Sequence, residues 1–122
     1  MARITGLGGI FFKASDPKAL AAWYRDTLGF PIEDWGGAML KSDNGGPGFA
    51  VWSPFAADTT YFAPSDKPYM INFAVDDLGS FVTQLEAKGV AILKQSDEGA
   101  MGLFAWILDP DGNKIELWQP GK

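Results

Sequence analysis

The sequence predicts an α+β domain built from two copies of one unit, a strand followed by a helix and three further strands. Three observations support this prediction. Each half opens with an apolar or alternating segment, an aspartate-capped amphipathic helix follows it, and similar segments, AVWSP and ELWQP, end the two copies. With 122 residues the chain fits one domain. We therefore expect a single domain, 1–122, with module one at about 1–54, a linker at about 55–68 and module two at about 69–122.

The first half opens with an apolar segment, Ile4–Ala14, which we expect to form a strand. Asp16 then offers a helix N-cap, and Pro17 stands at the first helical position. Apolar residues recur after them at helical spacing, and Gly29 stands where a left-handed C-terminal residue is expected. These signals predict a helix over 16–28.

The second half repeats this order. Tyr69–Val75 alternates as a strand does, Asp76 and Asp77 offer a cap for a second helix, and Gly89 closes that helix. Because turns select Asp, Pro, Gly and Asn, the DPDGN segment at 109–113 is expected to be a hairpin turn. The remaining strands are expected near 38–41, 49–52, 91–94, 103–108 and 114–118.

The composition argues against several classes of function. The chain has a net charge of -5 and no run of Lys or Arg, so nucleic acid is not an expected partner. Its apolar runs are too short for a membrane span or a signal-peptide core, so no membrane association and a cytoplasmic location are expected. The sequence has no Cys, which removes disulfides and thiol chemistry. It has no His, which removes the commonest metal ligand and general base.

The chain resembles the vicinal oxygen chelate superfamily in three motifs, FFKASDPKALAAWYRDTLGF in the first half and INFAVDDLGSF and DPDGNKIELWQP in the second. This superfamily includes glyoxalase I, the bleomycin-resistance proteins, the fosfomycin-resistance enzymes and the extradiol dioxygenases. The resemblance spans essentially the whole chain. It implies two βαβββ modules that form a curled mixed sheet around a cleft, with the helices packed on the outer face. It also implies a homodimer, since modules of this family pair within one chain or across two chains.

Many members of this family hold a divalent metal at four inward-facing positions, one from the first and one from the last strand of each module. The capping aspartates and the match of VWSP to LWQP place four residues there: Gly9, Ala50, Met70 and Glu116. Only Glu116 offers a carboxylate, whereas stable transition-metal sites recruit three or four protein donors. We therefore expect no metal and no other cofactor, which argues against the metal-dependent lyase, dioxygenase and epimerase activities of the family.

Side chains alternate between the two faces of a strand, so the residues that share the cleft side follow from these positions. The candidate ligand-binding residues are Phe11, Lys13, Trp52, Met70, Asn72 and Trp118. The opposite face is expected to pack under the helices through Ile10, Phe12, Ile71, Phe73, Val75, Ile115 and Leu117. In this interpretation the rings stack on a ligand, and Glu116 is the candidate catalytic acid or base, because an apolar slot raises the pKa of a carboxyl group. Alternatively, the tryptophans only fill the core, and Glu116 pairs with Lys13, lies exposed at an edge or makes a structural hydrogen bond.

Three functions remain open on this basis. The leading hypothesis is a metal-free protein that binds an aromatic or cationic small molecule, similar to bleomycin-resistance-type proteins, with cation–π contacts of roughly 0.5–2 kcal/mol each. The second is a glyoxalase-like or lyase-type enzyme that uses Glu116 as acid or base, or that recruits a metal through other donors. The third is a non-catalytic interaction module with a vestigial cleft.

Overall fold

The computed structural model describes residues 2–41 and 49–121. Over these residues, seven strands form one mixed sheet and two α-helices pack against it. The elements follow in the order β1 (Ile4–Ala14), α1 (Pro17–Leu28), β2 (Ala38–Lys41), β3 (Phe49–Ala56), β4 (Tyr69–Val75), α2 (Leu78–Ala87), β5 (Lys94–Asp97), a 3-10 helix η1 (Gly99–Met101), β6 (Gly102–Leu108) and β7 (Lys114–Pro120). No helix in the described part of the chain is long and apolar enough to cross a membrane.

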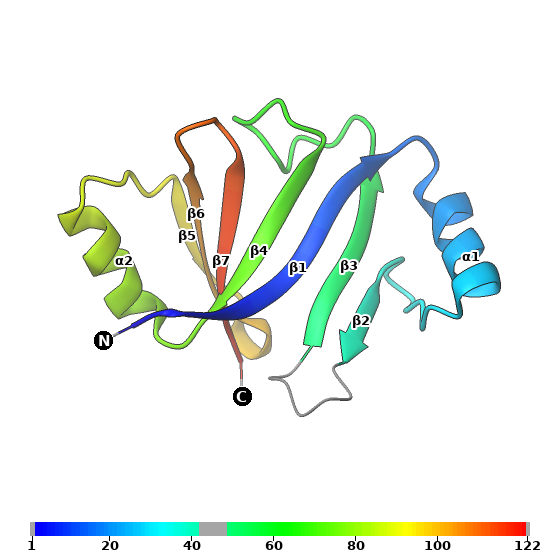
Figure 1. The fold of residues 1–122 in the computed structure, drawn as a ribbon, viewed down its shortest axis with the longest axis horizontal. Coiled ribbons are helices and arrows are strands. Elements are labelled where there is room, and N and C mark those ends of the chain that lie inside the picture. Colours follow the sequence, from blue (N-terminus) through cyan, green and yellow to red (C-terminus); the bar gives the residue numbers. More distant parts are fainter. Residues whose placement is uncertain (1, 42–48, 122) are drawn as a thin grey trace.

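The sheet is continuous across both halves of the chain because their first strands, β1 and β4, pair at its centre (Figure 1). The strand order is β2-β3-β1-β4-β7-β6-β5. β1 and β4 are antiparallel, with Ile10 opposite Ile71, and each pairs in parallel with the last strand of its own half, β3 or β7. The first half has the two strands predicted after its helix, near 38–41 and 49–52, and the third strand of the repeated unit is represented there only by an isolated bridge between Ile32 and Ala38. The predicted α+β fold is confirmed.

Both helices begin at the aspartates that predict them. At the start of α1 the Asp16 side chain accepts a hydrogen bond of 3.1 Å from the Ala19 amide. In α2 the Asp77 side chain accepts one of 3.2 Å from the Ser80 amide. Gly29 follows α1 with a φ of 75°, a left-handed conformation that glycine adopts without steric cost. These contacts are local in sequence, which explains why the helix boundaries are predictable.

The two helices lie at opposite ends of the sheet, α1 against β1 and β3, and α2 against β6 and β7 (Figure 1). Several of the residues expected beneath helices are packed there: Phe12, Phe73, Val75, Ile115 and Leu117. Ile10 is an exception, because it lies on a central strand away from either helix core and is 44% exposed. The prediction of a buried outer face is therefore wrong for Ile10.

The edge strand β5 lies three residues beyond its predicted place. It covers Lys94–Asp97 instead of 91–94, and Lys94 pairs with Trp106 of β6. Edge strands in natural sheets are often short and carry charged residues, so the apolar residues before Lys94 are a poor guide to where pairing starts.

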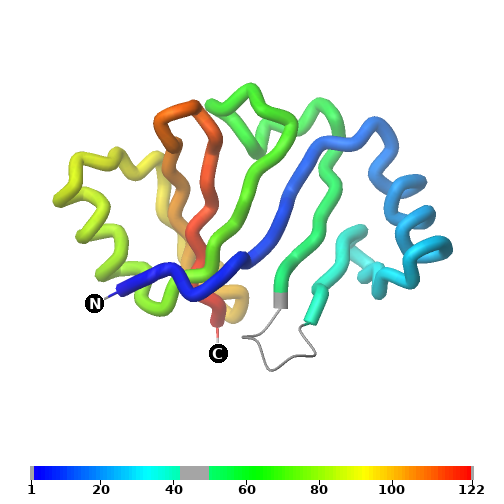
Figure 2. Tube along the Cα trace, in the orientation of Figure 1, coloured from blue at the N-terminus to red at the C-terminus, as the bar shows by residue number. Residues whose placement is uncertain are grey.

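The linker between β3 and β4 runs beside the β6–β7 turn at one end of the sheet (Figure 2). That turn, 109–113, closes as predicted, with the Asp109 amide donating a hydrogen bond of 3.0 Å to the Asn113 carbonyl oxygen. Lys114 follows the turn, and its Nζ donates a hydrogen bond of 2.7 Å to the Tyr61 carbonyl oxygen of the linker. The linker is thereby held against the strands of the second half.

Candidate functional site

Glu116 lies in the middle of β7 on the face of the sheet opposite the helix cores, and it is only 2% exposed. The strand register places Asn72 of β4 on one side of it and Trp106 of β6 on the other. Asn72 Nδ2 donates a hydrogen bond of 2.6 Å to Glu116 Oε1, and Trp106 Nε1 donates one of 2.8 Å to Oε2. A third donor, the hydroxyl of Tyr61, reaches Oε2 from the linker. One carboxylate therefore accepts hydrogen bonds from three side chains.

These three donors explain how an acidic side chain is tolerated inside the protein. Burying a carboxylate costs several kcal/mol unless hydrogen bonds replace those of water. Each hydrogen bond to a charged group contributes roughly 1.5–3 kcal/mol, so three of them offset a large part of that cost. The alternative that places Glu116 exposed at a sheet edge is wrong.

The amide of Asn72 has very little space around it. Its Oδ1 atom is buried and has no hydrogen-bond partner, while its Nδ2 is committed to Glu116. The backbone of Gly8 passes so close that a Cβ atom there would lie 2.0 Å from Asn72 Oδ1 and 3.2 Å from Trp118 Cε3. A glycine at this position is what allows the Asn72 amide to face Glu116.

Aromatic rings surround the buried carboxylate. One cluster joins both halves of the chain and the linker, and consists of Phe11, Phe62, Met70, Phe104, Trp106 and Trp118, with Val51 and Phe55 packed against it. Within it, Phe104 stacks on Trp106 on one side and on Trp118 on the other, with ring centroids 6.0 Å apart in both pairs. We call this set with Glu116 and Asn72 the aromatic slot.

Two linker residues close the slot in different ways. Phe62 is fully buried within the aromatic cluster, whereas Tyr61 is 38% exposed at its surface. The Tyr61 ring stacks on Phe55, with centroids 5.4 Å apart and planes inclined by 5°, and meets Trp106 edge-on. Phe62 therefore anchors the linker, and Tyr61 covers Glu116 from the solvent side.

Two lysines lie beside the covered carboxylate. Lys114 Nζ lies 5.3 Å from the ring centre of Tyr61 and 5.8 Å from that of Trp106, and Lys94 Nζ lies 5.9 Å from Trp106. Burial lowers the pKa of the Lys114 ammonium group; the Glu116 carboxylate opposes this change and Lys94 adds to it. Burial also raises the pKa of the Tyr61 phenol, and the Glu116 carboxylate raises it further. Tyr61 is therefore a neutral donor at physiological pH.

Most of the residues expected at the site lie in the aromatic slot: Phe11, Met70, Asn72, Glu116 and Trp118. Lys13 is placed on the same face by strand alternation, two residues beyond Phe11 and opposite Phe55, and is half-buried. It is not among the three donors that bind Glu116.

Trp52 does not face the slot, and its predicted place is wrong. It pairs with Ile10, on the helix side of the sheet, and packs against Tyr24 and Phe30 at centroid distances of 4.4 and 5.2 Å. It belongs to the small core beneath α1 together with Ala38 and others. The likeness of AVWSP to ELWQP suggests that Trp52 faces the slot as Trp118 does. The observed pairing of β3 with β1 places Trp52 on the helix side, so Val51 and Phe55 face the slot instead.

The same register changes the counterpart of Glu116 in the first half. The two N-cap residues, Asp16 and Asp77, are equivalent, so counting back from them makes Phe11 of β1 the counterpart of Asn72 of β4. The β3 residue opposite Phe11 is Ser53, so Ser53 replaces Ala50 as the structural equivalent of Glu116. This correction introduces no histidine or carboxylate at the family's metal positions.

The polar groups around Glu116 do not fit a divalent metal. A metal ion needs lone pairs from several ligands, but the groups that surround this carboxylate are N–H and O–H donors that point at it. Over residues 2–41 and 49–121, no three His, Cys, Asp or Glu side chains gather where they could hold a metal ion.

Four residues at the site are absent from the predicted set: Tyr61, Phe104, Trp106 and Lys114. Phe104 and Trp106 come from the middle strand β6 and Tyr61 from the linker, whereas the predicted cleft residues come from the first and last strands of each module. Lys114 begins β7, and its position two residues before Glu116 is a signal that places it on the same face. The alternation of Phe104 and Trp106 about a small residue is a signal for one aromatic face of β6. The docking of Tyr61 carries no comparable local signal.

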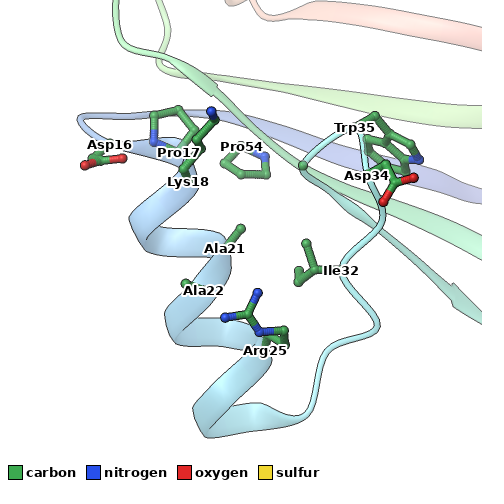
Figure 3. Close-up of a pocket in the computed structure, with 11 residues that line it drawn as sticks. Asp16, Pro17, Lys18, Ala21, Ala22, Arg25, Ile32, Asp34, Trp35 and Pro54 are labelled. Carbon is green, nitrogen blue, oxygen red and sulfur yellow. The ribbon is translucent and has the colours of Figure 1, made fainter.

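Two open hollows lie away from the aromatic slot. One, of about 630 Å³, lies between α1 and the turn that follows it, with Ala21, Ile32 and Trp35 among its lining residues (Figure 3). The other, of about 710 Å³, is lined by Pro31, Glu33, Met39, Leu40 and Lys41. Neither contains a predicted site residue, because the linker aromatics occupy the face where a cleft is expected.

The fold and site define a class of α+β protein in which two paired modules share one curled sheet with a buried polar centre on its inner face. The chain belongs to the Glyoxalase/Bleomycin resistance protein/Dioxygenase superfamily, whose family model matches residues 6–117. The predicted family resemblance is thus confirmed.

Solved structures with the same fold include enzymes and a protein described only by its family. Methylmalonyl-CoA epimerase from Mycobacterium tuberculosis is 20% identical with a TM-score of 0.68, over 98% of this chain and 90% of that one. A Streptomyces coelicolor methylmalonyl-CoA epimerase variant in complex with 2-nitronate-propionyl-CoA is 20% identical with a TM-score of 0.69, over 98% and 100%. A superfamily member from Vibrio splendidus 12B01 is 15% identical with a TM-score of 0.58, over 98% and 99%. At these identities the likeness extends to the fold alone.

Proposed function

We propose that this protein binds an aromatic or cationic small molecule in the aromatic slot without using a metal. The observation that carries the proposal is the Glu116 carboxylate, which is 2% exposed and framed by Trp106, Phe104 and Trp118. Small-molecule sites combine apolar and aromatic walls with a few convergent polar groups, and the slot has that composition.

The hydrogen bonds of Glu116 favour recognition over acid–base catalysis. Both carboxylate oxygens already accept hydrogen bonds, two of them from Asn72 and Trp106, which the sheet holds in place. Donors on both oxygens orient this carboxylate as a hydrogen-bond acceptor, which is the role that recognition of a ligand donor requires. The lyase alternative predicts instead that the protein turns over a bound substrate and that Glu116→Gln abolishes this turnover.

The test is a ligand screen on the intact chain by thermal shift and tryptophan fluorescence, with neutral phenols, indoles and quaternary ammonium compounds. We expect at least one class to raise Tm and change the emission. Glu116→Gln should weaken binding about 10- to 100-fold, because a hydrogen bond to a charged group contributes roughly 1.5–3 kcal/mol. Glu86→Gln removes an exposed carboxylate on α2 and should bind as the wild type does.

Two results would overturn the proposal. If no compound changes Tm or fluorescence at millimolar concentration, the interaction-module hypothesis is favoured. If protein purified without chelator contains stoichiometric Zn, Ni, Fe or Mn, the metal-free part is wrong. The expected homodimer and cytoplasmic location stay predictions, and light scattering after gel filtration checks the first.

A further inference from the structure

Tyr61 is bound in the slot as a ligand would be, although it belongs to the chain itself. Its hydroxyl donates to Glu116, its ring lies parallel to Phe55 with centroids 5.4 Å apart, and its ring packs in a T-shaped pair with Trp106 at 6.3 Å. Each of these contacts recognises a feature of a phenol, either the flat ring or the hydroxyl donor. We propose that the Tyr61 ring occupies the place of the ligand, and that the ligand is a neutral hydroxylated aromatic molecule that displaces it. This inference rests on the proposed binding function and specifies its ligand.

The charges around the slot favour a neutral ligand. An anion in the Tyr61 position would face the Glu116 carboxylate, while a cation would lie beside Lys114, whose Nζ is 5.3 Å from the Tyr61 ring centre. Lys94 adds a second positive charge at 5.9 Å from Trp106. A neutral aromatic ring that carries a hydroxyl group avoids both repulsions and still supplies the donor that Glu116 requires.

Displacing Tyr61 requires only a side-chain rotation. Its backbone amide donates to Thr59 Oγ1 at 3.2 Å, and its carbonyl oxygen accepts from Lys114 Nζ at 2.7 Å. The next residue, Phe62, is fully buried and anchors the linker. The Tyr61 side chain is 38% exposed, so its ring can rotate into solvent while the backbone keeps these contacts. When it leaves, Glu116 keeps the Asn72 and Trp106 hydrogen bonds and exposes one acceptor position.

The test compares Tyr61→Ala with the wild type, using p-cresol, toluene and benzylammonium as probes and calorimetry or NMR titration as the measurement. The apparent affinity of a site that is open only part of the time falls in proportion to its open fraction. If Tyr61 leaves the wild-type slot open for about 10% of the time or less, Tyr61→Ala should bind p-cresol at least about tenfold more tightly than the wild type. Toluene and benzylammonium should bind Tyr61→Ala at least about tenfold more weakly than p-cresol, because they lack the neutral hydroxyl donor.

Tyr69 provides the matched control. It is also 38% exposed and its hydroxyl also donates a hydrogen bond, to Asn113 Oδ1 at 2.9 Å, but it does not contact Glu116. Tyr69→Ala removes the same side chain and should bind p-cresol as the wild type does. Equal gains in both variants would indicate a nonspecific cavity and overturn the proposal.

A second variant covers the case in which Tyr61→Ala does not fold. Tyr61→Phe keeps the ring and removes only the competing hydroxyl, so p-cresol should bind it more tightly than the wild type. No gain in either folded variant, or equal binding of toluene and p-cresol, would overturn the inference. If the wild type binds another class of compound and the Tyr61 variants do not change that binding, this inference fails while the proposed function stands.

Discussion

At the scale of single residues, the site depends on one carboxylate and the groups that reach it. The family resemblance implies that Glu116 faces inward, and the structure buries it on the inner face. Trp106 lies only ten positions away, across the predicted 109–113 hairpin, whereas Tyr61 comes from the linker, 55 positions away, where no local pattern predicts the contact. Glu116 makes a structural hydrogen bond with Tyr61, and under the proposed function the same carboxylate binds a ligand when the Tyr61 side chain moves away.

Gly8 is predicted to be essential to this arrangement. An alanine Cβ at Gly8 would lie 2.0 Å from Asn72 Oδ1, so Gly8→Ala must displace the amide from Glu116 or shift β1. We expect a loss of about 1–3 kcal/mol in the free energy of unfolding, measured by urea denaturation. Gly6→Ala is the control, since a Cβ at Gly6 would meet nothing within 4 Å, and it should be neutral or slightly stabilising. Equal effects of the two changes would contradict the assigned role of Gly8.

The pH dependence of stability should reveal the Tyr61 hydrogen bond. The folded pKa of Tyr61 lies above the ordinary tyrosine value of about 10, owing to burial and to Glu116. Its contribution is therefore fully present below about pH 10 and is lost as pH rises further, because the unfolded chain ionises first. We expect the wild type to lose more stability than Tyr61→Phe between pH 9 and pH 11, roughly the range around that value, in urea unfolding. If the free energy of unfolding falls equally with pH in the two proteins, folding does not raise the pKa of the Tyr61 hydroxyl.

At the scale of elements, strand pairing overrules local sequence likeness. The Asp16 and Asp77 side chains cap the two helices by accepting hydrogen bonds from amides three positions further along the chain. Short-range sequence patterns are therefore sufficient to predict where the helices begin. Trp52 shows where such patterns fail, because its orientation depends on which residue of β1 it pairs with. The displaced edge strand β5 has a related cause, because pairing with β6 sets its start at Lys94 although apolar residues precede it.

Trp52→Phe should separate stability from ligand binding. The Trp52 indole packs under α1 against Tyr24, Phe30 and Phe12. Replacing it with the smaller phenylalanine ring should therefore lower the free energy of unfolding by about 1–3 kcal/mol. Affinity for a slot ligand should stay within about twofold, whereas Trp118→Phe should weaken it, because Trp118 lies in the slot cluster. Denaturation and titration of both variants test this. A comparable loss of affinity in Trp52→Phe would mean that Trp52 contributes to ligand binding after all.

At the scale of the whole molecule, the two halves share one sheet and one aromatic cluster. β1 and β4 join them at the centre, and the cluster draws Phe11 from the first half, Phe62 from the linker and Trp118 from the second. The linker therefore has two roles: it connects the modules, and it covers the face on which the resemblance implies a cleft. Covering that face places the Tyr61 phenol against Glu116, and under the proposed function this contact determines which ligands can compete for the carboxylate.

The α+β fold, the repeated unit and the helix caps can be predicted from the sequence, because they depend on periodicity and on contacts between neighbours in the chain. The inward position of Glu116 is predicted only through the family resemblance. The three-dimensional packing was needed to establish that Trp52 lies under α1 and that Tyr61 closes the slot. The register of β3 against β1 and the docking of the linker are set by the packing of residues far apart in the sequence, which no local pattern predicts.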